Sequence, residues 1–220
     1  MVRGVNSRSA QMRAQRIANT EERLIEAAAR LFVERGYVAT TLTAVAAAAG
    51  VAPRTVYLRF DTKVALFKRT MDVMLVGDSA PVDVAHRDWM QRAFTAPTCA
   101  ERIRLMARGT GEMFSRIGPL LAVSEQAAAI EPAIAAAAQA GRETTRDELR
   151  RFWSALFADG LLPAGADADW LADTAVMTCS VDTYLHANRT LGWSADTYAD
   201  WLEKTWLRIV DAVGRKGTPV

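Results

Sequence analysis

The chain has 220 residues, of which 50% are hydrophobic, enough to bury one ordinary core or two modest ones. This composition excludes collagen-like, fibrous and intrinsically disordered chains. The formal net charge is only +2, but residues 1–63 hold 10 Lys and Arg against 5 Asp and Glu, whereas the remaining residues hold 17 against 20. The excess positive charge therefore lies in the first third of the chain, where it suits a polyanionic partner.

Residues 1–19 contain no acidic side chain, and four arginines are spread among Ser, Asn and Gln: Arg3, Arg8, Arg13 and Arg16. Because the segment has little periodicity, we expect a flexible basic arm. Two interpretations stay open, an arm that adds phosphate or minor-groove contacts and a ragged start without a role. The segment has no apolar run of the kind that a signal peptide needs.

Three short helical patterns follow between residues 20 and 63. The first starts with Thr20 as a plausible cap and ends at Gly36, and the second starts at Thr41 and ends at Gly50. Pro53 then opens a third pattern, because proline is tolerated in the first turn of a helix. This order of helix, glycine-containing turn and helix predicts helix-turn-helix geometry.

The third pattern buries Val56 and Phe60, so its other positions face outward. Arg, Thr and Tyr side chains in such a row reach both base edges and phosphates, as a recognition helix does. A lysine at the start of the next helix suits a phosphate contact. The predicted DNA-binding residues are Thr41, Thr43, Pro53, Arg54, Thr55, Tyr57, Arg59 and Lys63.

This stretch resembles the tetracycline-repressor (TetR) family of bacterial transcription regulators. The resemblance runs from Leu24-Ile25 through AAARLFVERGY, ATTLTAVAAAAGV, RTVYLRF and DTKVAL to Leu66, with departures at Thr43, Ala52 and Arg59 that bear on the operator sequence. It implies an all-α chain: the basic arm at 1–19, a three-helix DNA-binding head at 20–66, and a helical effector-binding and dimerisation body at 67–220.

The body has helical patterns throughout. A helix from Lys63 to about Val76 precedes a break at 77–81, and helices follow at about 82–95 and from Cys99 to about Ile117. We expect Gly118-Pro119 to interrupt the chain there. Later helices are expected at 120–157, with Pro132 as a boundary, at 167–191 and at 194–213.

The last two predicted helices carry wide apolar stripes, which exceed the needs of one small core and favour a four-helix interface in a homodimer. The alternative is that both stripes complete the core of a single chain. The residues predicted for the dimer interface are Trp170, Thr178, Val181, Leu185, Trp201, Leu202, Thr205, Trp206 and Ile209.

The resemblance also implies a ligand cavity among the middle helices, where Met and aromatic side chains would suit an adaptable apolar site. Plain core packing explains the same side chains. The residues predicted to line the pocket are Met74, Trp89, Met106, Met113, Phe114, Trp153, Phe157, Met177 and Tyr184.

The remaining residues contain few motifs for metal binding, redox chemistry or catalysis. Cys99 and Cys179 form no Cys-x-x-Cys or Cys/His group, so we expect a reducing cytoplasm, no metal and no cofactor, with a redox role for either thiol as the less favoured alternative. No apolar run approaches the roughly 18 residues of a membrane span, so no membrane partner is expected. Catalytic motifs are also absent, which disfavours an enzyme.

The sequence therefore predicts a regulator, most simply a repressor, that binds a palindromic double-stranded DNA operator as a homodimer. A small hydrophobic effector would release it. A regulator controlled by a protein partner is the alternative, and an all-helical enzyme the remote one.

Overall fold

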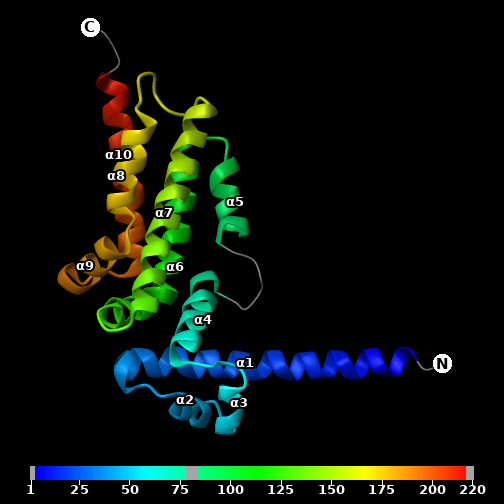
Figure 1. Ribbon diagram of the computed structural model, residues 1–220. Helices are drawn as coiled ribbons and strands as arrows, with labels where there is room; N and C mark the ends of the chain where they lie inside the picture. The colour runs from blue at the N-terminus through cyan, green and yellow to red at the C-terminus, as the bar shows by residue number, and fades with distance from the viewer. Residues whose placement is uncertain (1–2, 78–83, 217–220) are drawn as a thin grey trace.

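The computed structural model describes residues 3–77 and 84–216, and every regular element in these ranges is helical. The all-α prediction is therefore confirmed. The helices form a small head, which contains the N-terminal third of the chain, and a longer body that stands on it (Figure 1).

The head consists of α1 (Arg3–Ala39), α2 (Leu42–Ala48) and α3 (Pro53–Tyr57), and α4 (Lys63–Val76) leads from it into the body. Apolar side chains three or four residues apart on α1 meet those of the two short helices, and their burial stabilises the arrangement. The side chains with no exposed surface are Leu24, Ala28, Phe32, Val45, Ala46 and Val56.

Helix α1 begins earlier than the sequence predicted. It starts at Arg3, so residues 3–19 of the expected basic arm are helical and the interpretation of Thr20 as a helix cap is wrong; residues 1–2 lie outside the described ranges. The hydroxyl of Thr20 instead donates to the carbonyl of Arg16 inside the helix. Because residues 5–20 contain neither Pro nor Gly and are rich in Ala, Arg and Gln, nothing in this segment stops the helix. Gly36 breaks it later with a φ of 77°, as expected.

The body contains η1 (Val84–His86), α5 (Asp88–Thr95), α6 (Cys99–Ala128), α7 (Pro132–Ala158), α8 (Ala168–Thr178), α9 (Val181–Leu191) and α10 (Ala195–Lys216). Helices α6, α7, α8 and α10 run along its length, α5 lies against α6, and α9 lies across the bundle (Figure 1). The end of α4 at Gly77 and the start of α7 at Pro132 agree with the prediction.

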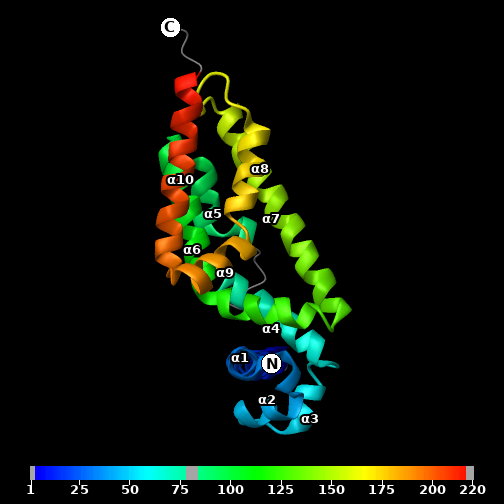
Figure 2. The same ribbon diagram turned by 90° about the vertical axis from the view of Figure 1, so that its left-hand side faces the viewer.

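Helix α6 continues through Gly118 and Pro119, so the predicted interruption at these residues is wrong. Proline removes one backbone hydrogen bond and favours a kink, but the flanking Ile117 and Leu120 are buried and hold both parts of the helix in the core. Figure 2 shows α6 bending so that its later part passes over the head.

The helix predicted at 167–191 is interrupted at Cys179 and Ser180 and forms the separate helices α8 and α9. The Ser180 hydroxyl caps α9 by accepting from the backbone N–H of Thr183. At the end of α8, the Thr178 carbonyl accepts a hydrogen bond from the Tyr198 hydroxyl, and Trp206 Nε1 donates to Thr178 Oγ1 at 2.8 Å. Two α10 side chains therefore stabilise the break, and only the folded arrangement reveals them.

Candidate nucleic-acid interface

Local signals in the sequence position the two short helices of the head. The Thr41 hydroxyl caps α2 by accepting from the backbone N–H of Ala44 at 3.1 Å, and Pro53 occupies the first turn of α3. Between them Gly50 has a φ of 63°, which only glycine adopts without strain. The predicted helix-turn-helix is therefore present, at the end of the molecule away from the body (Figures 1 and 2).

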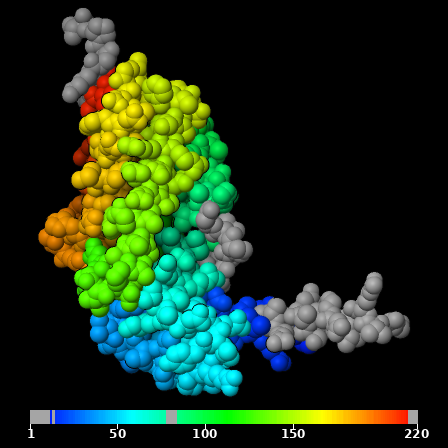
Figure 3. Space-filling view, viewed as in Figure 1, coloured from blue at the N-terminus to red at the C-terminus, as the bar shows by residue number. Residues whose placement is uncertain are grey.

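Helix α3 presents a row of side chains to solvent. Arg54 is exposed, Tyr57 and Leu58 are 52% and 75% exposed, and Thr55 and Arg59 are half-buried. Val56 is completely buried and holds the helix in place. Figure 3 shows this end of the molecule as an uncovered surface.

Helix α2 and its cap add further exposed positions, because Thr41, Thr43 and Pro53 also face solvent. Seven of the eight predicted DNA-binding residues therefore lie on or next to these two helices. Such a set of a guanidinium, hydroxyls and a phenol can donate to phosphates and to base edges.

Lys63, the eighth predicted residue, is engaged in contacts within the protein. Its ammonium donates to the carbonyl oxygens of Tyr37 at 2.9 Å and Val38 at 3.3 Å, and it sits 4.2 Å from the centre of the Tyr37 ring. Lys63 thus secures the end of α1, and a phosphate contact from the same ammonium stays a prediction.

Sequence reasoning missed Arg23, which supports the turn from α1. Its guanidinium donates to the carbonyl oxygens of Ala49 and Gly50, and so satisfies backbone groups left over at the end of α2. A surface hollow of about 570 Å³ lies here, lined by α1 from Arg23 to Arg30 and by residues 48–50. The long separation of Arg23 from Gly50 in the sequence leaves no local signal for this contact.

The residues predicted to form a ligand pocket lie partly in the core and partly on the surface. Met106, Phe114, Trp153 and Tyr184 are buried, and Met74, Trp89 and Met113 are half-buried. Phe114 stacks on Tyr184 with ring centres 4.6 Å apart, so these side chains fill space in the core. Phe157 and Met177 are 58% and 73% exposed, and their assignment to an internal pocket is wrong.

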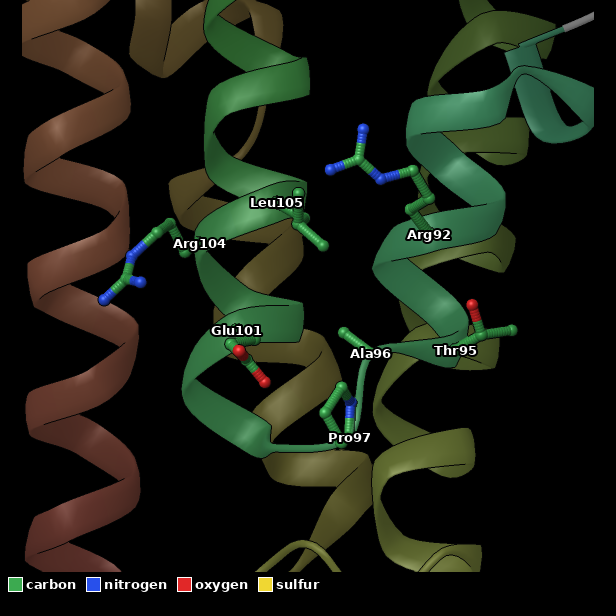
Figure 4. A pocket seen from close by; sticks show the side chains of 7 residues that line it. All are labelled: Arg92, Thr95, Ala96, Pro97, Glu101, Arg104 and Leu105. Atoms are coloured by element: carbon green, nitrogen blue, oxygen red, sulfur yellow. The ribbon is translucent and has the colours of Figure 1, made fainter.

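A second hollow, of about 350 Å³, lies between the end of α5 and the first turns of α6 and also contains none of the predicted pocket residues. Arg92 reaches across it towards Leu105, whereas Arg104 points away (Figure 4). Arg104 pairs with Glu203 at 3.0 Å, and the Glu101 carboxylate accepts from the Thr98 hydroxyl. Two of the charged side chains that line this hollow are therefore already engaged within the protein.

The predicted dimer interface needs correction as well. Leu185, Leu202 and Trp206 are at most 4% exposed and belong to this chain's own core, so a second copy cannot reach them. The apolar stripe of α10 packs on α6. The remaining predicted residues are half-buried, apart from the exposed Trp170; the half-buried ones are Thr178, Val181, Trp201, Thr205 and Ile209.

Exposed apolar side chains are nevertheless present on α7 and α8. Trp170, Asp173 and Met177 share one face of α8, and Trp170 is 52% exposed. Asp173 pairs with Arg150 of α7 at 3.3 Å, which aligns this face with the α7 positions Arg150 and Phe157. These five residues form what we name the α7–α8 face.

The two thiols lie in different surroundings. Burial raises the pKa of Cys179 from 9.0 to about 11, against a smaller opposite effect of its hydrogen bond to Thr110. Burial also raises the pKa of the half-buried Cys99. Both thiols are therefore mainly protonated at neutral pH, which lowers their reactivity.

Within residues 3–77 and 84–216, no three His, Cys, Asp or Glu side chains are grouped so that they could hold a metal ion. No helix in the same ranges is long and apolar enough to cross a membrane.

Comparison with known proteins agrees with this geometry. Residues 24–70 match the family model described as bacterial regulatory proteins, tetR family. No curated protein matches the chain.

Solved structures share the fold over most of their length. A TetR transcription regulator from Haloarcula marismortui is 17% identical, with a TM-score of 0.66 over 89% of this chain and 98% of that one. The TetR family regulator PfmR from Thermus thermophilus is 19% identical, with a TM-score of 0.62 over 84% and 97%. SmeT in complex with triclosan is 21% identical, with a TM-score of 0.65 over 86% and 90%.

The head contains the helix-turn-helix that the family model covers, and most of the chain shares the fold of the solved regulators. Residues 24–70 are therefore identified as a DNA-binding domain of the tetR family of bacterial regulatory proteins.

Proposed function

We propose that the protein is a cytoplasmic repressor that binds a palindromic operator as a homodimer, with residues 20–66 as the reading head and residues 67–220 as the regulatory body. The observation that carries this proposal is the solvent-exposed row formed by Arg54 and Tyr57 of α3 and Leu58 directly after it, held by the completely buried Val56. A guanidinium in such a row suits guanine, and a phenol suits phosphate.

The dimer would form through the α7–α8 face. Three large apolar side chains, those of Phe157, Trp170 and Met177, are exposed on these two neighbouring helices, and a two-fold axis through such a pair creates a four-helix bundle. Two heads held by one rigid body then read half-sites about 34–36 Å apart, or a multiple of that distance.

A small apolar effector would bind more tightly to dimers whose heads are spaced so that they do not fit the operator. It would thereby shift the dimer population towards the form that releases DNA. The structural likeness to SmeT, solved with triclosan, supports this part of the proposal. The Met and aromatic side chains of the middle helices would have to rearrange to admit it, because Phe114 and Tyr184 already stack on each other.

The tight packing of these side chains also favours a second candidate, a regulator controlled by a protein partner. A thermal-shift screen with small apolar compounds separates the two. A raised melting temperature supports a small effector, and no shift with any compound supports a protein partner.

The DNA-binding part is tested by selection from fragmented genomic DNA with the purified protein. The proposal expects enrichment of fragments that share a palindrome, and an Arg54→Ala variant should lose that enrichment. Recovery of unrelated fragments by the unmodified protein would contradict it.

A further inference from the structure

Tyr37 is the last aromatic residue of α1, and several contacts hold its ring in the head. The ring stacks on Phe32 with centres 5.9 Å apart and meets the edge of Phe67 at 5.4 Å. The Lys63 ammonium lies over the same ring and donates to the carbonyl of Tyr37. Tyr37 is only 6% exposed, so its side chain moves together with the head.

Glu131 belongs to the body. It lies in the corner between α6 and α7, where its backbone N–H donates to the carbonyl of Ala127 and its carbonyl accepts from Ile134 and Ala135. The backbone of Glu131 therefore moves with the end of α6 and the start of α7. Figure 1 shows this corner next to the end of α1.

The two residues meet across the boundary between head and body. The Tyr37 hydroxyl donates to Glu131 Oε2 at 3.3 Å, in a partly buried position. Burial and the neighbouring Glu131 carboxylate raise the pKa of Tyr37 to about 12, so the phenol stays a donor at neutral pH. A hydrogen bond weakens steeply with distance and misalignment, so this contact is sensitive to a displacement of either partner.

We propose that Tyr37 and Glu131 are positioning residues through which the α6–α7 corner sets the orientation of the DNA-binding head. This inference rests on the proposed function and adds the route by which the body acts on DNA affinity. The corner connects α6, which bends over the head, to α7, which contributes to the α7–α8 face. A shift of α7 at that face therefore reaches Tyr37 through one helix and one hydrogen bond.

The test compares single and double substitutions in the full chain. Tyr37→Phe removes the donor but keeps the ring, Glu131→Ala removes the acceptor, and Glu131→Gln keeps an acceptor oxygen. Operator and random-DNA affinities are measured for each variant, together with its melting temperature. Tyr198→Phe is the matched control, because it also removes a phenol hydroxyl that donates a hydrogen bond between two helices, but within the body.

We expect Tyr37→Phe and Glu131→Ala each to lower the operator-to-random affinity ratio roughly 3- to 10-fold. The double variant should lose no more than either single one, and Glu131→Gln should restore most of the ratio. Tyr198→Phe should lower the melting temperature without changing the ratio.

Unchanged ratios in Tyr37→Phe and Glu131→Ala, or additive losses in the double variant, would overturn the inference while the unmodified protein still binds its operator. If the unmodified protein shows no preference for any operator, the proposed function itself fails. If the variant of one residue does not fold, the variant of the other residue, Tyr37 or Glu131, carries the comparison.

Discussion

Gly109 of α6 lies directly against Trp89 of α5, so closely that a Cβ atom added at position 109 would come within 2.0 Å of the indole ring. Two other α6 glycines have similar neighbours, since a Cβ at Gly111 would meet Ala199 of α10 and one at Gly118 would meet Tyr184 of α9, each at 2.6 Å. Glycine on α6 thus lets three helices approach it closely. The central position of α6 in the body depends on these close approaches.

Gly109→Ala should therefore destabilise the protein even though alanine favours helices. The added methyl group must displace Trp89 or separate α5 from α6, at a cost of roughly 1–3 kcal/mol. The matched control is Gly141→Ala on α7, where nothing lies within 4 Å of the added atom. That variant should be unchanged or more stable by up to about 1 kcal/mol in urea unfolding. Equal stability of both variants would contradict the packing described for α6.

Arg54 should read bases. Arg54→Ala should weaken operator binding by roughly 1–3 kcal/mol and leave the affinity for random DNA nearly unchanged, as measured by fluorescence anisotropy. Arg142→Ala removes an exposed guanidinium from α7 and should change neither affinity. Equal losses on operator and random DNA would reassign Arg54 to a phosphate contact.

The early part of α1 should bind phosphates. Removal of residues 2–19 takes away four arginines and no acidic residue, so the dependence of log affinity on log salt concentration should become less steep. The slope should change by about 0.9 for each phosphate that the shortened protein no longer neutralises. Replacement of the four arginines by glutamine should reproduce this change without shortening the helix. An unaltered salt dependence in both variants would leave the segment without a DNA-binding role.

The α7–α8 face should mediate dimerisation. Met177→Glu places a charge on this face, and we expect the dimer dissociation constant to rise at least about tenfold in sedimentation equilibrium. Leu191→Glu is the control, because Leu191 is also exposed, at 55%, but lies at the end of α9. The face is not the interface if Met177→Glu associates as tightly as the unmodified chain.

Cys179 should make stability fall in alkaline solution. Its folded pKa of about 11 exceeds the ordinary 9.0, so the unfolded state loses this proton first as the pH rises. The stability that the Cys179 thiol contributes is complete below pH 9 and is lost between pH 9 and 11. The difference in unfolding free energy between the unmodified protein and Cys179→Ala should be constant from about pH 6 to 8 and shrink above about pH 9. A constant difference up to about pH 11 would contradict the assigned burial effect.

Much of the head was predictable because its signals are local. The cap at Thr41, the turn at Gly50 and the first-turn Pro53 each depend on a residue's own backbone preferences, as does the end of α4 at Gly77. The outward positions of α3 followed from the spacing of Val56 and Phe60, both of which are buried.

The body was less predictable because its structure depends on partners distant in the sequence. Pro119 stays inside α6 because buried neighbours on both sides hold the helix, which its own preference opposes. The break after Thr178 is supported by Tyr198 and Trp206 of α10. An apolar stripe also does not indicate what it packs against, so the sequence predicts an interface role for Leu202 and Trp206 although they belong to this chain's own core.

The central claim is that a dimer of this chain recognises a specific DNA sequence through α3. The most direct measurement is an anisotropy titration of a selected operator and of random DNA at two salt concentrations. The account predicts saturation at two protomers per operator and an affinity at least about a thousandfold higher than for random DNA, with both affinities falling as salt rises. Equal affinity for the two DNAs, without a defined stoichiometry, would contradict it.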